Sequence, residues 1–310
     1  MDRKIINKID RYSRLYGLTY KRRGIPMRLI IPFMKKWSRE ANKLLEDEKD
    51  FFSKQSPPGE EQKPGIIVSL TSFPARIKDV WKTIASIKRQ TCQPEKIILW
   101  LSKDEFPEEK LPDVLENMQD NLFQIRFVEG NVGSHKKYLY AFKEFADHTI
   151  VTLDDDMFYH KDVLKCLVDV SEKNRGKIIA NRVRRIPVND GPLSPYKKWK
   201  VKNLNPDDPD LIQIGVDGVL YPPGSLHREA FNSEIFMQLT PYADDVWLNA
   251  MARLNGTPVV YSGWKYRNIP VAEDSPSLEQ INCEKGRNDI QIKELRRYIK
   301  TKFGKDIYSK

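Results

Sequence analysis

A short apolar run that leads straight into three aspartates, TIVTLDDDM at residues 149–157, constrains the fold more than any other stretch of the chain. The apolar residues suit a strand that is buried on both faces of a parallel sheet. In such a sheet, ligands bind in the crevice at the carboxyl ends of the strands. We therefore expect Asp154, Asp155 and Asp156 to lie at a ligand-binding crevice.

The aspartate triplet needs a partner, because adjacent carboxylates repel one another unless they are solvated, protonated or bound to a cation. Mg²⁺ and Mn²⁺ prefer oxygen ligands and commonly link one or two carboxylates to a phosphate, so a divalent ion is a natural partner. The alternative is an acidic turn in which Asp156 or Asp162 caps the following helix. The triplet alone does not decide between a metal site and a helix cap.

Strands and helices alternate through the first half of the main body of the chain. The expected strands are IIVSL, KIILWLS, QIRFV and TIVTL, with helices near residues 78–89 and 138–145. Four alternations over about ninety residues predict a doubly wound α/β fold with a mainly parallel sheet. None of these strands is followed by a G-x-G-x-x-G fingerprint or a G-x-x-x-x-G-K-[ST] loop, which argues against a Rossmann dehydrogenase and a P-loop enzyme.

A second acidic pair, Asp244 and Asp245, opens a later helix. It follows an irregular stretch at residues 184–210 and two short strands whose glycines, Gly215 and Gly218, let the backbone approach other groups closely. Two acidic clusters suggest a division of labour in which one holds a metal and the other acts as a base. The alternative for the second pair is simple capping of its helix.

The order of these features resembles family-2 glycosyltransferases of the GT-A fold, which is the nucleotide-diphospho-sugar transferase fold with a Rossmann-like sheet. The phrase S-I-x-x-Q-T at residues 86–91 is similar to the end of the family's first helix, and the N-V-G turn at residues 131–133 is similar to its N-x-G turn. The aspartate triplet stands where the family carries its D-x-D motif, and Asp245 matches the catalytic carboxylate of its E-D pair. The resemblance spans Ile66 to Tyr261.

The resemblance implies a metal-dependent transferase that uses Mn²⁺ or Mg²⁺ and a nucleotide-diphosphate sugar, with a UDP-sugar as the expected donor. Asp156 is implied as a metal ligand, Asp154 as a contact to the metal or the ribose, and Asp155 as a contact to the donor sugar. Asp245 is implied as the base of an inverting reaction, with Asp244 beside it. The chain lacks the Q-x-x-R-W sequence of processive synthases, which favours a single transfer.

Further contacts are expected on both sides of the reaction. Candidate contacts to the nucleotide sugar are Thr71, Arg76, Lys136 and Lys137, although the two lysines are alternatively ordinary surface residues. Contacts to the acceptor, a glycan or lipid-linked glycan, are expected from Gly218, Tyr221 and Trp247.

The positive charge of the chain is concentrated at its N-terminus. Residues 1–39 contain twelve Lys or Arg against two Asp, a net charge of +10 that equals the net charge of all 310 residues. The body is therefore balanced, and a nucleic-acid groove across it is not supported. Cys92, Cys166 and Cys283 lack metal-ligand spacing and are expected to be packing residues.

The basic segment has apolar residues at helical spacing and is expected to form an amphipathic helix, followed by an apolar patch that Pro26 and Pro32 interrupt. Such a segment suits the headgroup region of an anionic membrane, and the alternative is a helical hairpin packed on the body. With neither a signal peptide nor a transmembrane run in the sequence, the expected location is the cytoplasm, at the inner face of the cell membrane.

These patterns divide the chain into three parts. Residues 1–62 form the basic arm and a polar linker, residues 63–270 the GT-A domain, and residues 271–310 a C-terminal helical extension. The body is expected to fold without the arm. The alternative functions are a non-catalytic membrane-surface adaptor, a sugar-nucleotide pyrophosphorylase-like enzyme and a glycosidase with two carboxylates. The pyrophosphorylase-like enzyme needs a glycine-rich loop after the first strand, and this loop is missing from the sequence.

Overall fold

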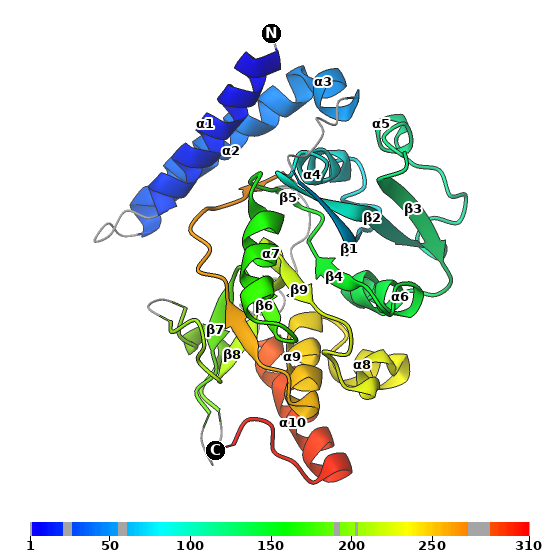
Figure 1. The fold of residues 1–310 in the computed structure, drawn as a ribbon, viewed down its shortest axis with the longest axis vertical. Helices are drawn as coiled ribbons and strands as arrows, with labels where there is room; N and C mark the ends of the chain where they lie inside the picture. Colours follow the sequence, from blue (N-terminus) through cyan, green and yellow to red (C-terminus); the bar gives the residue numbers. More distant parts are fainter. Residues whose placement is uncertain are drawn as a thin grey trace.

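The centre of the molecule is a seven-stranded sheet with helices on both faces (Figure 1). The computed structural model describes residues 2–20, 27–54, 61–188, 193–201, 204–271 and 286–309. The strands, in sheet order, are β10 (Val259–Tyr261), β6 (Ile178–Ala180), β9 (Val219–Tyr221), β4 (Thr149–Thr152), β1 (Glu61–Thr71), β2 (Cys92–Ser102) and β3 (Phe123–Val128). This α/β architecture confirms the predicted fold class.

Every strand pair in this sheet is parallel except those of β9, which runs antiparallel to both β4 and β6. The reason lies in the turn before it, the 3₁₀ helix η3 (Gly215–Asp217). Gly215 lies close to Asp154 at the carboxyl end of β4, so the chain enters β9 from that end and must run back along the sheet. The sheet is therefore mixed at its centre.

Both faces of the sheet are buried, as the apolar run at residues 149–157 predicted. Neighbouring residues of one strand point to opposite faces, and Ile150 and Val151 accordingly belong to two different hydrophobic clusters. The first cluster includes α4 (Val80–Ile87) and α7 (Val163–Lys173). The second includes α6 (Lys136–Glu144), α8 (Ser233–Leu239), α9 (Asp244–Asn255) and α10 (Arg287–Phe303).

Smaller elements connect these layers. The short strands β5 (Met157–Phe158) and β11 (Ile269–Pro270) pair with each other, as do β7 (Val183–Arg185) and β8 (Leu211–Gln213). The remaining elements are α5 (Asp113–Glu116) and the 3₁₀ helices η1 (Gly133–His135), η2 (Tyr196–Lys198) and η4 (Arg228–Phe231). Both β7 and η2 fall within or at the edge of the stretch predicted to be irregular.

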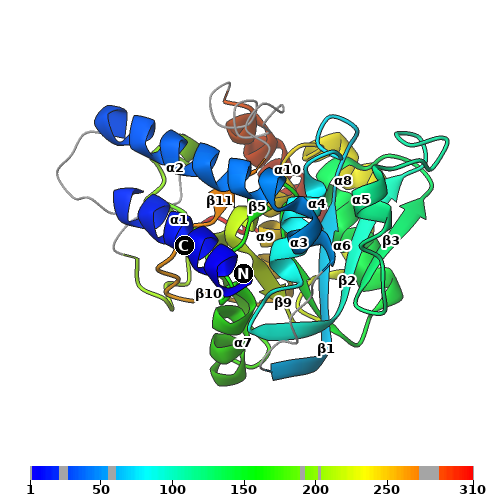
Figure 2. The ribbon, with the colours of Figure 1, turned by 90° about the horizontal axis from the view of Figure 1, so that it is seen from above.

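The N-terminal segment is a helical hairpin of α1 (Asp2–Tyr20) and α2 (Met27–Asp47), followed by α3 (Lys49–Lys54). The two helices run side by side and antiparallel (Figures 1 and 2). The rings of Tyr12 and Trp37 stack between them, with centroids 6.3 Å apart. The side chains of Ser38 and Asn42 both donate hydrogen bonds to the carbonyl oxygen of Pro270, at 3.0 and 2.9 Å, and thereby fasten the hairpin to β11.

The hairpin packs on the body, which is the alternative that the sequence left open for the basic segment. Residues of α1, α2 and α3 share the first hydrophobic cluster with the sheet, so the expectation that the body stands apart from the arm is wrong. Pro32, which interrupts the apolar patch in the sequence, lies inside α2 near its start. Part of the predicted linker has regular structure, since α3 and the start of β1 fall within it. None of the described helices combines the length and the apolar character required to span a bilayer.

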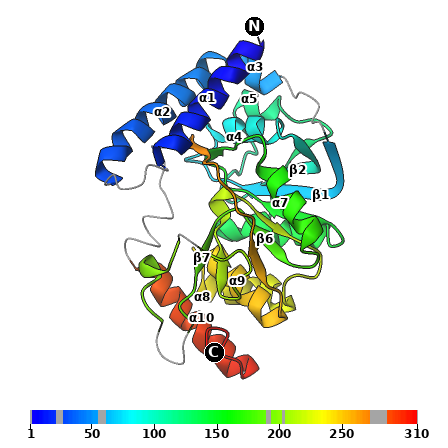
Figure 3. The same ribbon diagram turned by 60° about the vertical axis from the view of Figure 1, so that its left-hand side comes forward.

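The C-terminal helix α10 packs at the opposite end of the molecule from the hairpin (Figures 1 and 3). Its buried residues Ile292, Leu295 and Ile299 join the second hydrophobic cluster. Residues 272–285, which belong to the predicted C-terminal extension, lie outside the described residues. The boundaries at residues 62 and 270 remain predictions.

Candidate functional site

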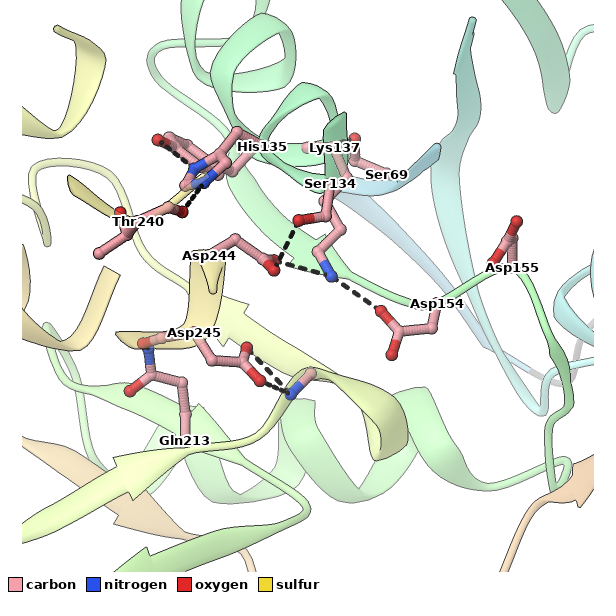
Figure 4. A network of polar contacts seen from close by, with 12 residues as sticks. Ser69, Ser134, His135, Lys137, Asp154, Asp155, Gln213, Thr240, Asp244 and Asp245 are labelled. Atoms are coloured by element: carbon pink, nitrogen blue, oxygen red, sulfur yellow. Dashed lines mark hydrogen bonds and ion pairs between the residues drawn. The ribbon is translucent and has the colours of Figure 1, made fainter. Parts of the chain in front are cut away.

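Four elements meet at the carboxyl end of β4 and bring the two acidic clusters together (Figure 4). Asp154 lies just after β4, Lys137 lies in the first turn of α6, Asp244 and Asp245 lie in the first turn of α9, and Gly215 begins η3. These residues are far apart in the sequence, so only the folded chain assembles them.

Lys137 lies between the two acidic clusters. Its Nζ is 2.7 Å from Oδ1 of Asp154 and 2.9 Å from Oδ2 of Asp244, and its side chain is 7% exposed. A buried ammonium is stable only when opposite charges compensate its desolvation. Burial alone would lower the pKa of Lys137, but the negative charges of the neighbouring aspartates outweigh burial and raise that pKa. Lys137 therefore carries a permanent positive charge that both acidic clusters share.

Hydrogen bonds from the sheet fix the position of the start of α6. The hydroxyl of Ser69, on β1, donates a short hydrogen bond to the carbonyl oxygen of Lys137. The indole Nε1 of Trp100, on β2, donates in turn to Oγ of Ser69 at 2.9 Å. Two strands of the rigid sheet thus determine the position of Lys137.

Asp155 points away from Lys137 and into the loop after β1 (Figure 4). Its carboxylate accepts hydrogen bonds from Oγ of Ser72 and, at 2.7 Å, from Nη1 of Arg76. Its carbonyl oxygen accepts a hydrogen bond from Oγ1 of Thr83 at 2.9 Å. Burial raises the pKa of Asp155 although Arg76 opposes that shift. Asp155 therefore joins the loop after β1 to the strand end.

Asp156 has the carboxylate best suited to an additional cation. Its Oδ2 is 2.9 Å from Nη1 of Arg76, whereas its Oδ1 is buried and has no hydrogen-bond partner among the described residues. Burial, followed by the charge of Asp155, raises the pKa of Asp156 to about 7. An unpartnered buried oxygen is costly and suits a ligand that supplies positive charge.

The donor set fits a divalent ion that shares its coordination with a substrate. The described part of the chain holds no cluster of three or more His, Cys, Asp or Glu side chains that could bind a metal alone. Mg²⁺ usually takes one or two protein carboxylates and completes its shell with water and substrate phosphates. Asp156, with Asp154 two residues before it, meets that smaller requirement.

Asp244 and Asp245 lie side by side but differ in their surroundings. The carboxylate of Asp245 accepts the backbone N–H of Gly215, at 3.0 and 3.1 Å to its two oxygens. Burial, followed by the charge of Asp244, raises the pKa of Asp245 to about 8. Burial would also raise the pKa of Asp244, but the charge of Lys137 outweighs it and lowers that pKa. The pair therefore divides into one carboxylate that stays ionised and one whose pKa is close to neutrality.

Helix capping does not explain either acidic cluster. Asp162 occupies the N-cap position of α7 but makes no side-chain capping hydrogen bond. Ala243 is the N-cap residue of α9, and Asp244 and Asp245 lie in the first turn after it. Oδ1 of Asp244 instead accepts a hydrogen bond from Oγ of Ser134 at 2.9 Å. The capping hydrogen bonds that the sequence offered as alternatives for the two acidic clusters are thus not formed.

Two predicted contacts to the nucleotide sugar turn away from the acidic clusters. The side chain of Lys136 is buried, and its Nζ lies 2.6 Å from Oε2 of Glu105 and 3.1 Å from Oδ1 of Asn131. Thr71 donates its hydroxyl to the carbonyl oxygen of Trp100 at 2.7 Å. Of these four predicted contacts, Arg76 and Lys137 reach the aspartates, whereas Lys136 binds the side chains of Glu105 and Asn131 and Thr71 binds the backbone of β2.

The three predicted acceptor contacts lie in the core, which corrects that expectation. The side chains of Tyr221 and Trp247 have no exposed surface. A Cβ at Gly218 would come within 2.9 Å of Cδ2 of Leu153, so this glycine gives room for packing. Burial leaves these residues no surface for an acceptor.

Three residues of the site were not assigned a role from the sequence. Ser72 and Ser134 each donate a hydroxyl to an aspartate of the site. Gly215 was noted only as a point of close backbone approach, and its bond to Asp245 depends on the folded chain. The sequence signal for the two serines was their position beside predicted motifs, Ser72 after the first strand and Ser134 after the N-V-G turn.

Comparison with known families gives a match over more than half of the chain. The family model described as Glycosyl transferase family 2 matches residues 71–234. Comparison with curated proteins gives no match.

Several solved structures share part of the architecture at low similarity. TarS from S. aureus in complex with UDP is 14% identical, with a TM-score of 0.41 over 65% of this chain and 59% of that chain. An apo UDP-glucose pyrophosphorylase is 12% identical, with a TM-score of 0.39 over 78% of this chain and 99% of that chain. A 4-diphosphocytidyl-2C-methyl-D-erythritol synthase from Anaerococcus prevotii is 15% identical, with a TM-score of 0.39 over 69% and 92%. These TM-scores lie below 0.5, and the functional argument therefore rests on the family match and the site.

Proposed function

Because this chain belongs to glycosyl transferase family 2, we propose that its site moves a sugar from a nucleotide-diphosphate sugar to an acceptor hydroxyl with inversion at the anomeric carbon. The observation that carries the proposal is the placement of two unlike acidic groups on either side of Lys137. Asp154 and the rest of the triplet lie on one side, and Asp244 and Asp245 lie on the other.

The aspartate triplet is the proposed donor side. Asp156, through its unpartnered oxygen, and Asp154 would hold Mn²⁺ or Mg²⁺ together with the diphosphate of the donor, for which a UDP-sugar is the expected form. The ion would neutralise charge on the diphosphate as it leaves. Arg76 and Lys137 supply protein charge to the same region, and Asp155 keeps Arg76 next to Asp156.

Asp245 is the proposed base. The acceptor oxygen forms a bond to the anomeric carbon while the bond from that carbon to the diphosphate oxygen breaks, and the acceptor proton passes to Asp245. The N–H of Gly215 orients the Asp245 carboxylate, and Lys137 keeps Asp244 ionised beside it. General-base catalysis of this kind contributes roughly 10² to 10⁴-fold to the rate.

The proposed acceptor is a glycan or lipid-linked glycan at the inner face of the cell membrane. Support comes from the basic N-terminal hairpin, whose described residues include exposed apolar side chains on α2. The rival membrane-surface adaptor required acidic clusters that serve only as helix caps. The side chains described above bind Lys137, Arg76 and Gly215 instead, which favours the enzyme.

Two substitutions separate the proposed roles. Asp156→Asn removes a charged ligand at nearly constant shape, so Mn²⁺-dependent thermal stabilisation by UDP and sugar transfer should both be lost. Asp245→Asn removes only the base, so the stabilisation should persist while transfer falls by at least about 10²-fold. The stabilisation is a direct measure of binding because a ligand of the folded state raises stability by mass action.

The opposite results would identify the error. Full transfer by Asp156→Asn would contradict the metal assignment. An active Asp245→Asn variant together with an inactive Asp244→Asn variant would move the base to Asp244. If neither substitution affects transfer, the inverting mechanism is wrong.

A further inference from the structure

An exposed apolar surface lies at the start of α2. Leu29, Ile31 and Phe33 are 57%, 43% and 59% exposed. The other large apolar residues that are exposed in the described chain each come from a different segment, namely Val201, Tyr242, Tyr266 and Ile290. Single exposed apolar residues are normal on protein surfaces, whereas a cluster indicates a binding surface. Leu29 and Phe33 are one turn apart and share one side of α2, where they form an exposed apolar pair, whereas Ile31 lies on a different side of the helix.

The charges around this apolar pair all have the same sign. Arg28, Lys35, Lys36 and Arg39 are exposed, and residues 28–39 contain no acidic residue. None of the four basic side chains forms a salt bridge with a described residue, in contrast to Lys82 and Lys88 of the neighbouring α4 region, which pair with acids. We call residues 28–39 with these exposed side chains the α2 docking face.

The α2 docking face is held rigidly by the rest of the helix. Ala41, Leu44 and Leu45, further along α2, are buried in the first hydrophobic cluster. Ser38 and Asn42 bind the carbonyl oxygen of Pro270, as described above. The face is therefore presented by a folded element, so binding there requires little additional ordering of the chain.

A short path joins the α2 docking face to the donor side of the site. Pro270 belongs to β11, which pairs with β5 immediately after the aspartate triplet. The next residue, Val271, donates its N–H to the carbonyl oxygen of Asp156 at 2.9 Å. A surface bound by the α2 docking face would consequently lie at a defined position relative to Asp156.

We propose that the α2 docking face binds the headgroup region of an anionic membrane leaflet. Leu29 and Phe33, one helical turn apart, enter the boundary between headgroups and acyl chains, and the basic residues bind the lipid phosphates. This inference rests on the proposed peripheral location and identifies the surface responsible for it. A second copy of the chain fits less well, because the same four basic residues would meet themselves.

The test is sedimentation of the full chain with vesicles of phosphatidylglycerol and phosphatidylcholine. Leu29→Ser/Phe33→Ser should weaken binding by about 10-fold or more, because two large apolar side chains no longer leave water. Ile290→Ser is the matched control, since Ile290 is 63% exposed on α10 at the other end of the molecule, and it should bind like the unmodified chain. Binding should also weaken in pure phosphatidylcholine and as salt rises.

Three outcomes would overturn the proposal: an unmodified chain that ignores anionic vesicles at low salt, a double variant that binds normally, or equal weakening by Ile290→Ser. Light scattering that shows a dimer lost only in the double variant would assign the face to a second copy instead. Mn²⁺-dependent stabilisation by UDP is measured on the same samples. If it persists while vesicle binding is lost, the docking inference stands. If it is absent from the unmodified chain, the proposed donor chemistry fails separately.

Discussion

At the scale of single residues, one ammonium group determines how the acidic side chains differ. Lys137 lies within 3 Å of Asp154 and Asp244, and it lowers the pKa of Asp244 against the effect of burial. Burial raises the pKa of Asp245, repulsion from Asp244 adds to that rise, and the charge of Lys137 opposes it without cancelling it. Two adjacent carboxylates with opposite shifts are the arrangement expected where one residue must accept a proton near neutral pH.

The raised pKa of Asp245 predicts the pH dependence of transfer. The base must be ionised, and a pKa raised to about 8 means that its ionised fraction increases as pH rises through 8. We expect kcat/KM to increase between pH 7 and pH 9 with a midpoint near 8, because this parameter reports groups of the free enzyme. The measurement is initial-rate kinetics at saturating Mn²⁺. The residual kcat/KM of Asp245→Asn should not increase between pH 7 and pH 9. A wild-type profile that is flat across this range would contradict the assignment.

At the scale of elements, η3 brings its backbone against the side chains of α6 and α9. A Cβ at Gly215 would lie 3.2 Å from Oδ1 of Asp245 and 3.3 Å from Nζ of Lys137. The φ of Gly215 is not in the left-handed region, so glycine is needed here for space and not for its conformational freedom. The backbone of η3 thus positions the proposed base, Asp245, through the N–H of Gly215.

Gly215→Ala should therefore impair catalysis more than folding. The added methyl group must displace Asp245 or Lys137 by a few tenths of an ångström, and small misplacements of a catalytic group cost roughly 10 to 100-fold in rate. Transfer assays and thermal melts on the same preparation measure the two effects. Gly17→Ala on α1 is the control, since its nearest contact would be an ordinary 3.7 Å. Wild-type transfer by Gly215→Ala would show that the base tolerates displacement.

At the scale of the whole molecule, the two terminal segments complete the two hydrophobic clusters. Ile9 and Leu45 of the hairpin and Phe52 of α3 belong to the cluster on one face of the sheet. The ring of Phe52 packs edge-on against Phe158, with centroids 6.1 Å apart, directly after the aspartate triplet. The hairpin and α3 are consequently part of the structure that supports the site.

Deleting residues 1–54 should destabilise the body, contrary to the expectation from the sequence. The deletion exposes the apolar surface of the first cluster, at a cost of roughly 25 cal/mol for each Å² returned to water. We expect a melting temperature lower by about 10 °C or more, or an insoluble protein, because about 1 kcal/mol corresponds to several degrees in a domain of this size. The comparison is Leu29→Ser/Phe33→Ser, which changes only exposed residues and should melt like the unmodified chain. An unchanged melting temperature after the deletion would show that the body folds independently of residues 1–54.

The sequence by itself determined the features that depend on local patterns. Four strands of the sheet, the helices α4, α6 and α7 and the exit of β4 into the aspartate triplet follow from apolar periodicity, which reports burial within a few residues. The family and the two acidic clusters follow from short motifs in a defined order, and the match over residues 71–234 confirms the family.

Only the tertiary structure decided which neighbours each side chain meets. Lys136 and Lys137 are adjacent at the start of one helix, where successive residues point in directions about 100° apart. One therefore reaches Glu105 and the other reaches Asp154 and Asp244. Likewise, the reversed direction of β9 and the docking of α2 on Pro270 depend on contacts between distant parts of the chain. Such contacts leave no local periodicity, because their partners are chosen when the sheet and its covering helices pack together.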